Sequence, residues 1–155
     1  MNEKSQFQTA TRAIQLGNAI TWIKNQTTQF LGLTATQSEA IRYILKHHEE
    51  KPLTAGDLME ALHLSQSTVA GIIQRLEDKE LITRFASPEN TRKSIISPTS
   101  KGLELEEKLK QIALETEDLL HKGMTPEEQA EFDRLLQKAL DNANRARENG
   151  GKQSL

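Results

Sequence analysis

Short polar side chains follow one another at the start of a predicted helix that spans residues 65 to 79. Hydroxyl, amide and guanidinium groups can hydrogen-bond to the edges of DNA bases, and short side chains let a helix approach those edges in the major groove. A helix N-terminus also presents backbone N–H groups that favour a phosphate. The residues with this potential are Ser65, Gln66, Ser67, Thr68, Gly71, Gln74 and Arg75.

The opposite face of this helix is apolar and is expected to be buried. Its residues, at helical spacing, are Val69, Ile72, Ile73 and Leu76. A shorter predicted helix precedes it, with Thr54 as its cap and Leu58 and Leu62 inward. Since Leu64 leaves room only for a tight turn, the two helices are predicted to form a helix-turn-helix. The alternative is an ordinary solvated helix, because polar outer faces are common.

Two short apolar segments, residues 81–86 and 93–98, flank a polar loop and predict an antiparallel hairpin. A hairpin directly after a recognition helix makes a winged helix. Arg92 at its tip could enter a minor groove, whose negative potential attracts a guanidinium. Lys93 and Arg84 could neutralise phosphates. The alternative is a surface hairpin whose charges are merely solvated.

Helices are predicted on both sides of this region. The first runs from about Ser5 to Phe30. Thr34 followed by Gln37 predicts a capping box for the second, with Thr36 and Glu39 as an alternative cap. The buried stripe of the second helix is predicted to contain Ala40, Ile41, Ile44 and Leu45.

The C-terminal third is predicted to form two long helices. One starts at Thr99 or Ser100 and continues without a break to Leu119. The next starts at Thr125-Pro126, where a cap precedes a proline at the first helical position. Its buried stripe is predicted to be Phe132, Leu135, Leu136, Ala139, Leu140 and Ala143. The tail, residues 148–155 with its paired glycines, is expected to be disordered.

The composition limits which kinds of protein the chain could be. At 155 residues the chain can form a typical domain, but only 35% of its residues are apolar. This low share favours an elongated helical protein that completes its core with a partner subunit. The chain contains no cysteine, which excludes disulfides and thiolate metal sites. The sequence has no stretch that resembles a signal peptide and no run approaching the roughly 20 apolar residues that span a bilayer. We therefore expect a cytoplasmic protein that does not associate with a membrane.

Charge is unevenly distributed along the chain. Residues 1–62 hold 6 basic and 6 acidic side chains, residues 63–102 hold 6 and 4, and residues 103–155 hold 8 and 12. A polyanionic partner would therefore meet the middle of the chain. The overall pI of about 6.1 predicts that non-specific binding to nucleic acid is weak.

Catalytic and metal sites receive little support from the sequence. We find no glycine-rich phosphate loop, no nucleophile elbow and no HExxH motif. The adjacent carboxylates Glu106-Glu107 and Glu127-Glu128 diverge on their helices. Residues 47–50 (His-His-Glu-Glu) and the pair Glu117 and His121 could offer metal ligands. Both also fit ordinary solvated helix surfaces, and we predict neither a metal nor another cofactor.

Taken together, these segments resemble the MarR (multiple antibiotic resistance regulator) family of bacterial transcription factors. The resemblance spans nearly the whole chain, in the order and spacing of the family. The stretches that carry it are "LTATQ" at 33–37, "TAGDLMEALHLSQSTVAGIIQRLEDKELITR" at 54–84, "ENTRKSIISPTSKG" at 89–102 and "MTPEEQAEFDRLLQKAL" at 124–140.

The resemblance implies a mainly α-helical winged helix-turn-helix protein that forms a homodimer through its N- and C-terminal helices. The implied segments are residues 1–32 for dimerisation, 33–99 for DNA binding, 100–147 for dimerisation and 148–155 as a tail. A two-fold dimer would bind a palindromic double-stranded operator with half-sites about 10 base pairs apart. It would repress by occluding a promoter. The alternatives are a winged helix that contacts only proteins and a regulator that responds to a metal ion.

The resemblance also implies relief of repression by a small aromatic or phenolic effector bound between the dimer helices and the winged domain. Trp22, Tyr43 and His47 are the candidate effector residues, since the family binds such molecules near its first, second and fifth helices. The alternative is that the single Trp and single Tyr pack in the dimer core.

Two positions depart from the family pattern. Asn90 stands where the family usually has an aspartate two residues before the wing arginine, so a salt bridge to Arg92 would become at best a hydrogen bond. Glu80 stands after the recognition helix, where the family favours glycine.

Overall fold

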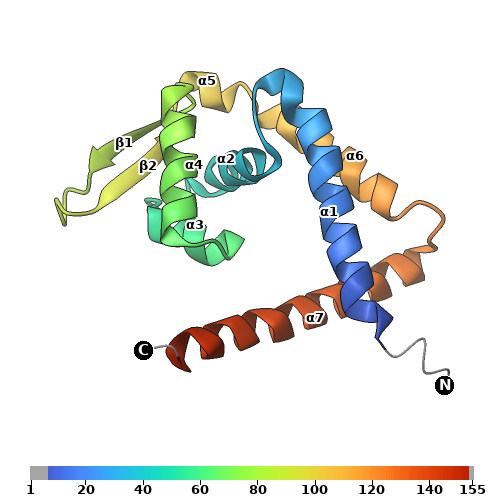
Figure 1. Ribbon diagram of the computed structural model, residues 1–155. Coiled ribbons are helices and arrows are strands. Elements are labelled where there is room, and N and C mark those ends of the chain that lie inside the picture. Colours follow the sequence, from blue (N-terminus) through green and yellow to red (C-terminus); the bar gives the residue numbers. More distant parts are fainter. Residues whose placement is uncertain (1–6, 154–155) are drawn as a thin grey trace. The chain divides into compact units, whose positions relative to one another are not determined.

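The computed structural model describes residues 7–153 and shows a mainly helical chain with one antiparallel hairpin (Figure 1). The predicted order of helices and strands is confirmed, except that one predicted C-terminal helix is divided into α5 and α6. The elements are α1 (Gln8–Thr28), the 3-10 helix η2 (Gln29–Leu31), α2 (Ala35–His47), α3 (Ala55–Leu62), α4 (Gln66–Asp78), β1 (Ile82–Ala86), β2 (Ser94–Pro98), α5 (Ser100–Leu103), α6 (Glu106–Leu120) and α7 (Pro126–Gln153). Two compact units divide the chain, one up to Thr116 and one from Glu117.

Helix starts follow the predicted caps. Thr34, not Thr36, caps α2: its hydroxyl accepts from the Gln37 N–H at 3.2 Å, and its own N–H donates to the Gln37 amide at 3.3 Å. Thr125 and Glu128 form the same reciprocal pair at α7, at 3.1 and 2.9 Å. These bonds satisfy backbone donors that have no partner within the helix, which is why short-range sequence signals locate the helix ends.

The core of the first unit lies where α2, α3, α4 and the hairpin meet. Its fully buried side chains include Ile41, Ile44, Leu53, Leu58, Leu76, Ile82 and Leu109. The Ile96 N–H of β2 donates to the Leu53 carbonyl at 2.8 Å, which ties the root of the hairpin to this core. The winged helix therefore has its own hydrophobic centre, and its outer elements are held by their inner faces.

The turn between α3 and α4 is as tight as predicted. His63 ends α3 in the left-handed region (φ 51°), and the Leu64 N–H bonds to the Met59 carbonyl at 3.2 Å. The chain then enters α4 directly at its cap, Ser65. This geometry fixes α4 against α3 and directs its polar face outward.

Glu80, the departure from the family glycine, also lies in the left-handed region, at φ 59°. The conformation is held because the Glu80 N–H donates to Glu77 O at 2.8 Å and the Thr99 hydroxyl donates to Glu80 O at 2.6 Å. An L-residue in this region costs about 1–2 kcal/mol, whereas glycine adopts it freely. The strain is local to the end of the recognition helix.

Replacing Glu80 by glycine is therefore expected to raise the free energy of unfolding by about 1 kcal/mol, since both backbone bonds can stay. Urea unfolding measures it. Lys79, at φ −82°, is the matched control, and Lys79→Gly is expected to lower stability. A fall in stability for Glu80→Gly would contradict the account of strain.

Two predictions about the C-terminal helices are wrong. The helix predicted from residue 99 to residue 119 is broken, because the Leu105 N–H bonds to the Gly102 carbonyl three residues back and tightens the chain between α5 and α6. Residues 148–153, expected to be disordered, continue α7. An existing helix adds residues without a new nucleation step, so it can extend through Gly150 and Gly151. Residues 154 and 155, and Ser5 at the other end, lie outside the described residues.

In the second unit, His121 and Phe132 contact each other edge to face, and His121 Nε2 lies 3.1 Å from Asp133 Oδ1. The apolar stripe of α7, predicted to be buried, is exposed in the single chain: Leu135, Leu136 and Leu140 are 48%, 43% and 48% accessible. Among the described residues, no helix is long and apolar enough to cross a membrane.

Candidate nucleic-acid interface

The N-terminal end of α4 is organised by Ser65. Its hydroxyl oxygen accepts from the Thr68 N–H at 3.3 Å and lies 2.9 Å from the Thr68 hydroxyl and 3.3 Å from that of Ser67. Ser65 thus acts first as the helix cap, at the residue where the sequence predicts that the helix begins. The next three side chains, Gln66, Ser67 and Thr68, are exposed at the end of the helix.

The outer face of α4 is polar and open. Gly71, Gln74 and Arg75 are exposed, whereas Val69, Ile72, Ile73 and Leu76 are buried. A Cβ added at Gly71 would meet nothing within 4 Å, so the glycine leaves free space outside the helix instead of serving internal packing. This arrangement allows another backbone to approach α4 closely.

Gln74 and Arg84 are not free to act alone. Arg84 on β1 donates from Nε and Nη2 to the two carboxylate oxygens of Glu77, at 3.0 and 2.7 Å, and Nη2 also donates to Gln74 Oε1 at 3.3 Å. Gln74 Nε2 donates to Asp78 Oδ1 at 2.8 Å. We refer to these four residues as the Arg84 cluster.

Within the Arg84 cluster, Glu77 and Arg84 shift each other's pKa. Hydrogen bonding to the Arg84 guanidinium lowers the pKa of Glu77 below its ordinary value, and the same bonds raise the pKa of Arg84. Both groups are therefore charged at neutral pH. Sequence reasoning missed Glu77, although an acid in the last turn of a helix, where the dipole favours cations, was an available signal.

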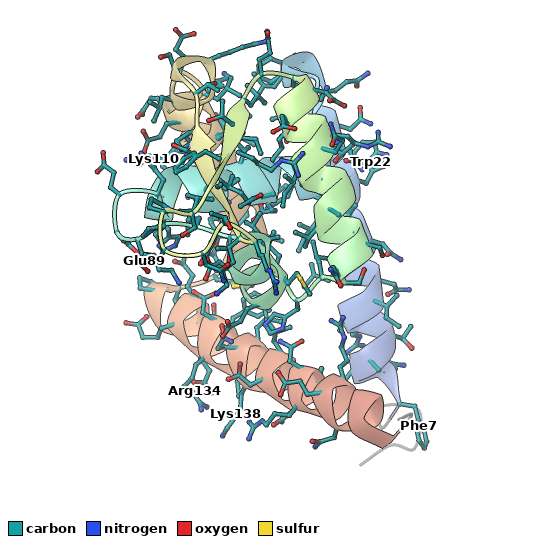
Figure 2. All side chains as sticks on the ribbon, turned by 90° about the vertical axis from the view of Figure 1, so that its left-hand side faces the viewer. Phe7, Trp22, Glu89, Lys110, Arg134 and Lys138 are labelled. Carbon is teal, nitrogen blue, oxygen red and sulfur yellow. The ribbon has the colours of Figure 1, made fainter. Side chains whose placement is uncertain are left out.

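The tip of the wing is shaped by Asn90. Its side-chain oxygen accepts from the backbone N–H of Arg92 at 3.1 Å, and its carbonyl accepts from the Lys93 N–H at 2.9 Å. The Asn90 side chain therefore holds the turn, and its bond goes to the backbone of Arg92 and not to the guanidinium. Arg92 and Lys93 are exposed on the same loop as Glu89, which Figure 2 labels.

The three predicted effector residues are only partly brought together. Tyr43 and His47 lie one turn apart on α2 with ring centroids 4.5 Å apart. Trp22 lies on α1 and is 65% exposed (Figure 2). A cavity of about 430 Å³ beside α2 is lined by other residues, namely Arg42, Leu45, Lys46, Glu106, Leu109 and Lys110.

The candidate metal ligands are engaged in ordinary helix contacts. His47 Nδ1 lies 2.7 Å from Glu50 Oε2, His48 Nδ1 lies 3.0 Å from the Leu45 carbonyl, and His121 is paired with Asp133. In the part of the chain that the structure describes, no three His, Asp or Glu side chains are grouped so that they could hold a metal ion.

Comparison with known sequences places the middle of the chain in a family. Residues 33–94 match the MarR family. The HTH-type transcriptional repressor NicR of Pseudomonas putida is 28% identical over 90 residues, which cover 58% of this chain and 57% of NicR. The match therefore spans little more than half of that relative.

Solved structures extend the likeness to most of the chain. The S. aureus MepR–DNA complex has a TM-score of 0.82 and 26% identity, covering 88% of this chain and 99% of MepR. BpsR of Bordetella bronchiseptica, studied for regulation of its DNA binding by 6-hydroxynicotinic acid, has a TM-score of 0.77 and 25% identity, covering 87% and 94%. The two kinds of comparison agree: residues 33–94 match the MarR family, and the fold around them is similar to those of MepR and BpsR.

Proposed function

We propose that the protein is a transcriptional regulator that binds specific double-stranded DNA sequences as a homodimer and represses from palindromic operators. The observation that carries the proposal is the exposed polar face of α4, open at Gly71 and followed by a hairpin with an exposed arginine at its tip. A repressor among the relatives, NicR, and a DNA complex of another, MepR, support it. Such a protein needs no catalytic group and acts on DNA in the bacterial cytoplasm.

In this proposal α4 enters the major groove. Gln66, Ser67 and Thr68 offer donors and acceptors to base edges near the helix N-terminus, and Arg75 offers a guanidinium one to two turns later. Arg92 enters the flanking minor groove and Lys93 contacts phosphate. The exposure of all six side chains is compatible with these roles.

The dimer is proposed from the exposed apolar side chains outside the winged helix. Large apolar groups remain accessible on α1, α6 and α7, among them Ile14, Trp22, Leu114, Leu119, Leu135, Leu136 and Leu140. Monomeric proteins rarely leave so much apolar surface to water, and a second copy of the same helices would cover it. A two-fold dimer then presents two α4 helices to two half-sites.

Selection of bound duplexes from a random DNA pool tests the proposal. We expect an inverted repeat whose half-sites lie about 10 base pairs apart. Absence of any sequence preference would reject the proposal in favour of a winged helix that contacts only proteins.

Arg92→Ala is expected to weaken binding to the selected duplex by about tenfold, because a guanidinium is lost from the minor groove. The slope of log K against log salt should fall by about one unit per half-site, since one counterion fewer is released. Arg134, exposed on α7, is the matched control, and Arg134→Ala should leave affinity and slope unchanged. An unaltered slope in Arg92→Ala would contradict the contact.

An effector site is proposed beside α2. The cavity of about 430 Å³ is lined by three cationic side chains, Arg42, Lys46 and Lys110, and by one carboxylate, Glu106, over the buried Leu45 and Leu109. This net positive lining suits an organic anion better than the surroundings of the exposed Trp22 do. Tyr43 and His47 stay candidates on the same helix. The test is to add 6-hydroxynicotinic acid, the compound named for BpsR, to the protein–DNA complex and to measure release of the DNA. If DNA binding is unchanged at millimolar concentration, that acid is rejected as the effector.

A further inference from the structure

The Arg84 cluster joins the recognition helix to the wing. Arg84 lies in the middle of β1, opposite Ile96 of β2, while Glu77 and Gln74 lie in the last two turns of α4. One guanidinium thus bonds to two side chains of α4 through three hydrogen bonds, two of which form a parallel pair to one carboxylate. Bidentate pairs of this kind fix orientation as well as distance.

The chemistry of the four groups fixes the Gln74 amide. A guanidinium cannot accept a hydrogen bond and a carboxylate cannot donate one, so Oε1 must face Arg84 and Nε2 must face Asp78. Each of the two amide atoms is thus engaged once, and Gln74 could offer a base only its second N–H and its second lone pair, in the orientation that the Arg84 cluster fixes. Its exposure alone suggested a side chain free to turn toward any base.

Phosphate binding is a poor explanation for the position and partners of Arg84. Nε and Nη2 of the guanidinium are committed to Glu77 and Gln74, so only Nη1 could meet a phosphate, and it would do so beside the carboxylates of Glu77 and Asp78. With one cation and two carboxylates, the Arg84 cluster has a net charge of −1. Such a group repels phosphates and does not attract them.

Glu77 itself is unfavourable in its place unless it has a partner. Glu77 and Asp78 lie in the last turn of α4, where the helix dipole favours positive charge. Arg84 supplies that positive charge from the neighbouring strand. The pair therefore stabilises the end of α4 only while β1 is held at its present angle to the helix.

Resting on the proposed function, we propose that Arg84 is a positioning residue: through Glu77 and Gln74 it locks the wing to the recognition helix and so sets the geometry with which the two elements meet DNA. A two-stranded hairpin is marginally stable by itself. Its base is fixed by the buried Ile82 and by the bond of Ile96 to Leu53, whereas Phe85, next to Arg84, is half exposed. Arg84 therefore restrains β1 between its buried base at Ile82 and its half-exposed Phe85.

Amide hydrogen exchange of the free protein tests the lock without DNA. Glu77→Gln and Arg84→Gln are each expected to raise exchange at Thr83–Ala86 by about two- to fivefold, the range of an exposed ion pair. The double variant should exchange no faster than either single variant, because both remove the same link. Arg134→Gln, which breaks a bidentate pair of equal geometry with Glu131 on α7, should leave these amides unchanged.

DNA binding provides the second readout. Glu77→Gln and Arg84→Gln should each weaken binding to the selected duplex by about two- to fivefold, and the salt slope of Arg84→Gln should equal that of the unaltered protein. The proposed lock is overturned if the single variants leave exchange at the β1 amides unchanged. It is also overturned if the effects of the two replacements add in the double variant. A slope lowered by about one unit in Arg84→Gln, or tighter binding by Glu77→Gln, also overturns it and assigns Arg84 to a phosphate. If the unaltered protein binds no DNA, the proposed function fails, while the exchange experiment still decides the lock.

Discussion

Replacing Leu136 and Leu140 together by glutamate is expected to convert the protein from a dimer to a monomer and to weaken its binding to the full operator by at least about 100-fold. Both leucines lie one turn apart on the exposed stripe of α7. Burying one leucine side chain contributes about 1.5–3 kcal/mol, and the two-fold axis repeats each loss in the second copy. The new carboxylates would also have to be buried without a partner.

Light scattering and sedimentation measure the mass of this variant, and an operator titration measures its affinity. Lys138, which Figure 2 shows on α7, provides the matched control, because Lys138→Glu changes the net charge by the same two units as the double replacement. The control should remain dimeric. A double variant that stays dimeric and binds the operator normally would remove the proposed role of α7.

Features that depend on neighbours in sequence were predictable. Three helix starts lie within one residue of their predicted positions. They are marked by Thr34 with Gln37, by Ser65 and by Thr125 with Glu128. Their hydrogen bonds close over three residues, so residue types at fixed spacing are enough to identify them. The alternation of buried and exposed positions on α4 was predictable for the same reason.

Features that depend on contacts between residues far apart in the sequence were not predictable. The bond between Arg84 and Glu77 requires the chain to turn from helix to strand at a defined angle, and the pair of His121 with Asp133 joins two helices. The close approach of Gly102 to the Leu81 carbonyl, 21 positions earlier, is a third such contact. Spacing along one element carries no information about such contacts. The roles in DNA binding of Ser65, Gln66, Ser67, Thr68, Gly71, Arg75, Arg92 and Lys93 stay predictions. For Gln74 and Arg84, also predicted to contact DNA, the proposed lock offers a different role.

Gly102 is the position at which a single methyl group is expected to do most damage to the winged helix. An added Cβ would lie 2.2 Å from the Leu81 carbonyl oxygen and 3.2 Å from its carbon, and both are backbone atoms that cannot swing aside. Leu81 is itself fixed: its N–H bonds to Leu76 O and its carbonyl accepts from the Thr99 N–H, each at 3.0 Å. The new methyl group can be accommodated only if the start of β1 moves away from α5.

Gly102→Ala is therefore expected to lower the free energy of unfolding by about 1–3 kcal/mol, although alanine is the better helix former. Urea unfolding measures the loss. Gly71→Ala is the matched comparison: it also lies in a helix, but its added methyl would meet nothing within 4 Å, so stability should rise by about 0.5–1 kcal/mol. Operator binding by the Gly71 variant should nevertheless weaken, since the methyl group would fill the space through which DNA approaches α4. A Gly102 variant as stable as the original would show that the α5 contact yields easily, and the wing would then depend chiefly on the Arg84 cluster for its position.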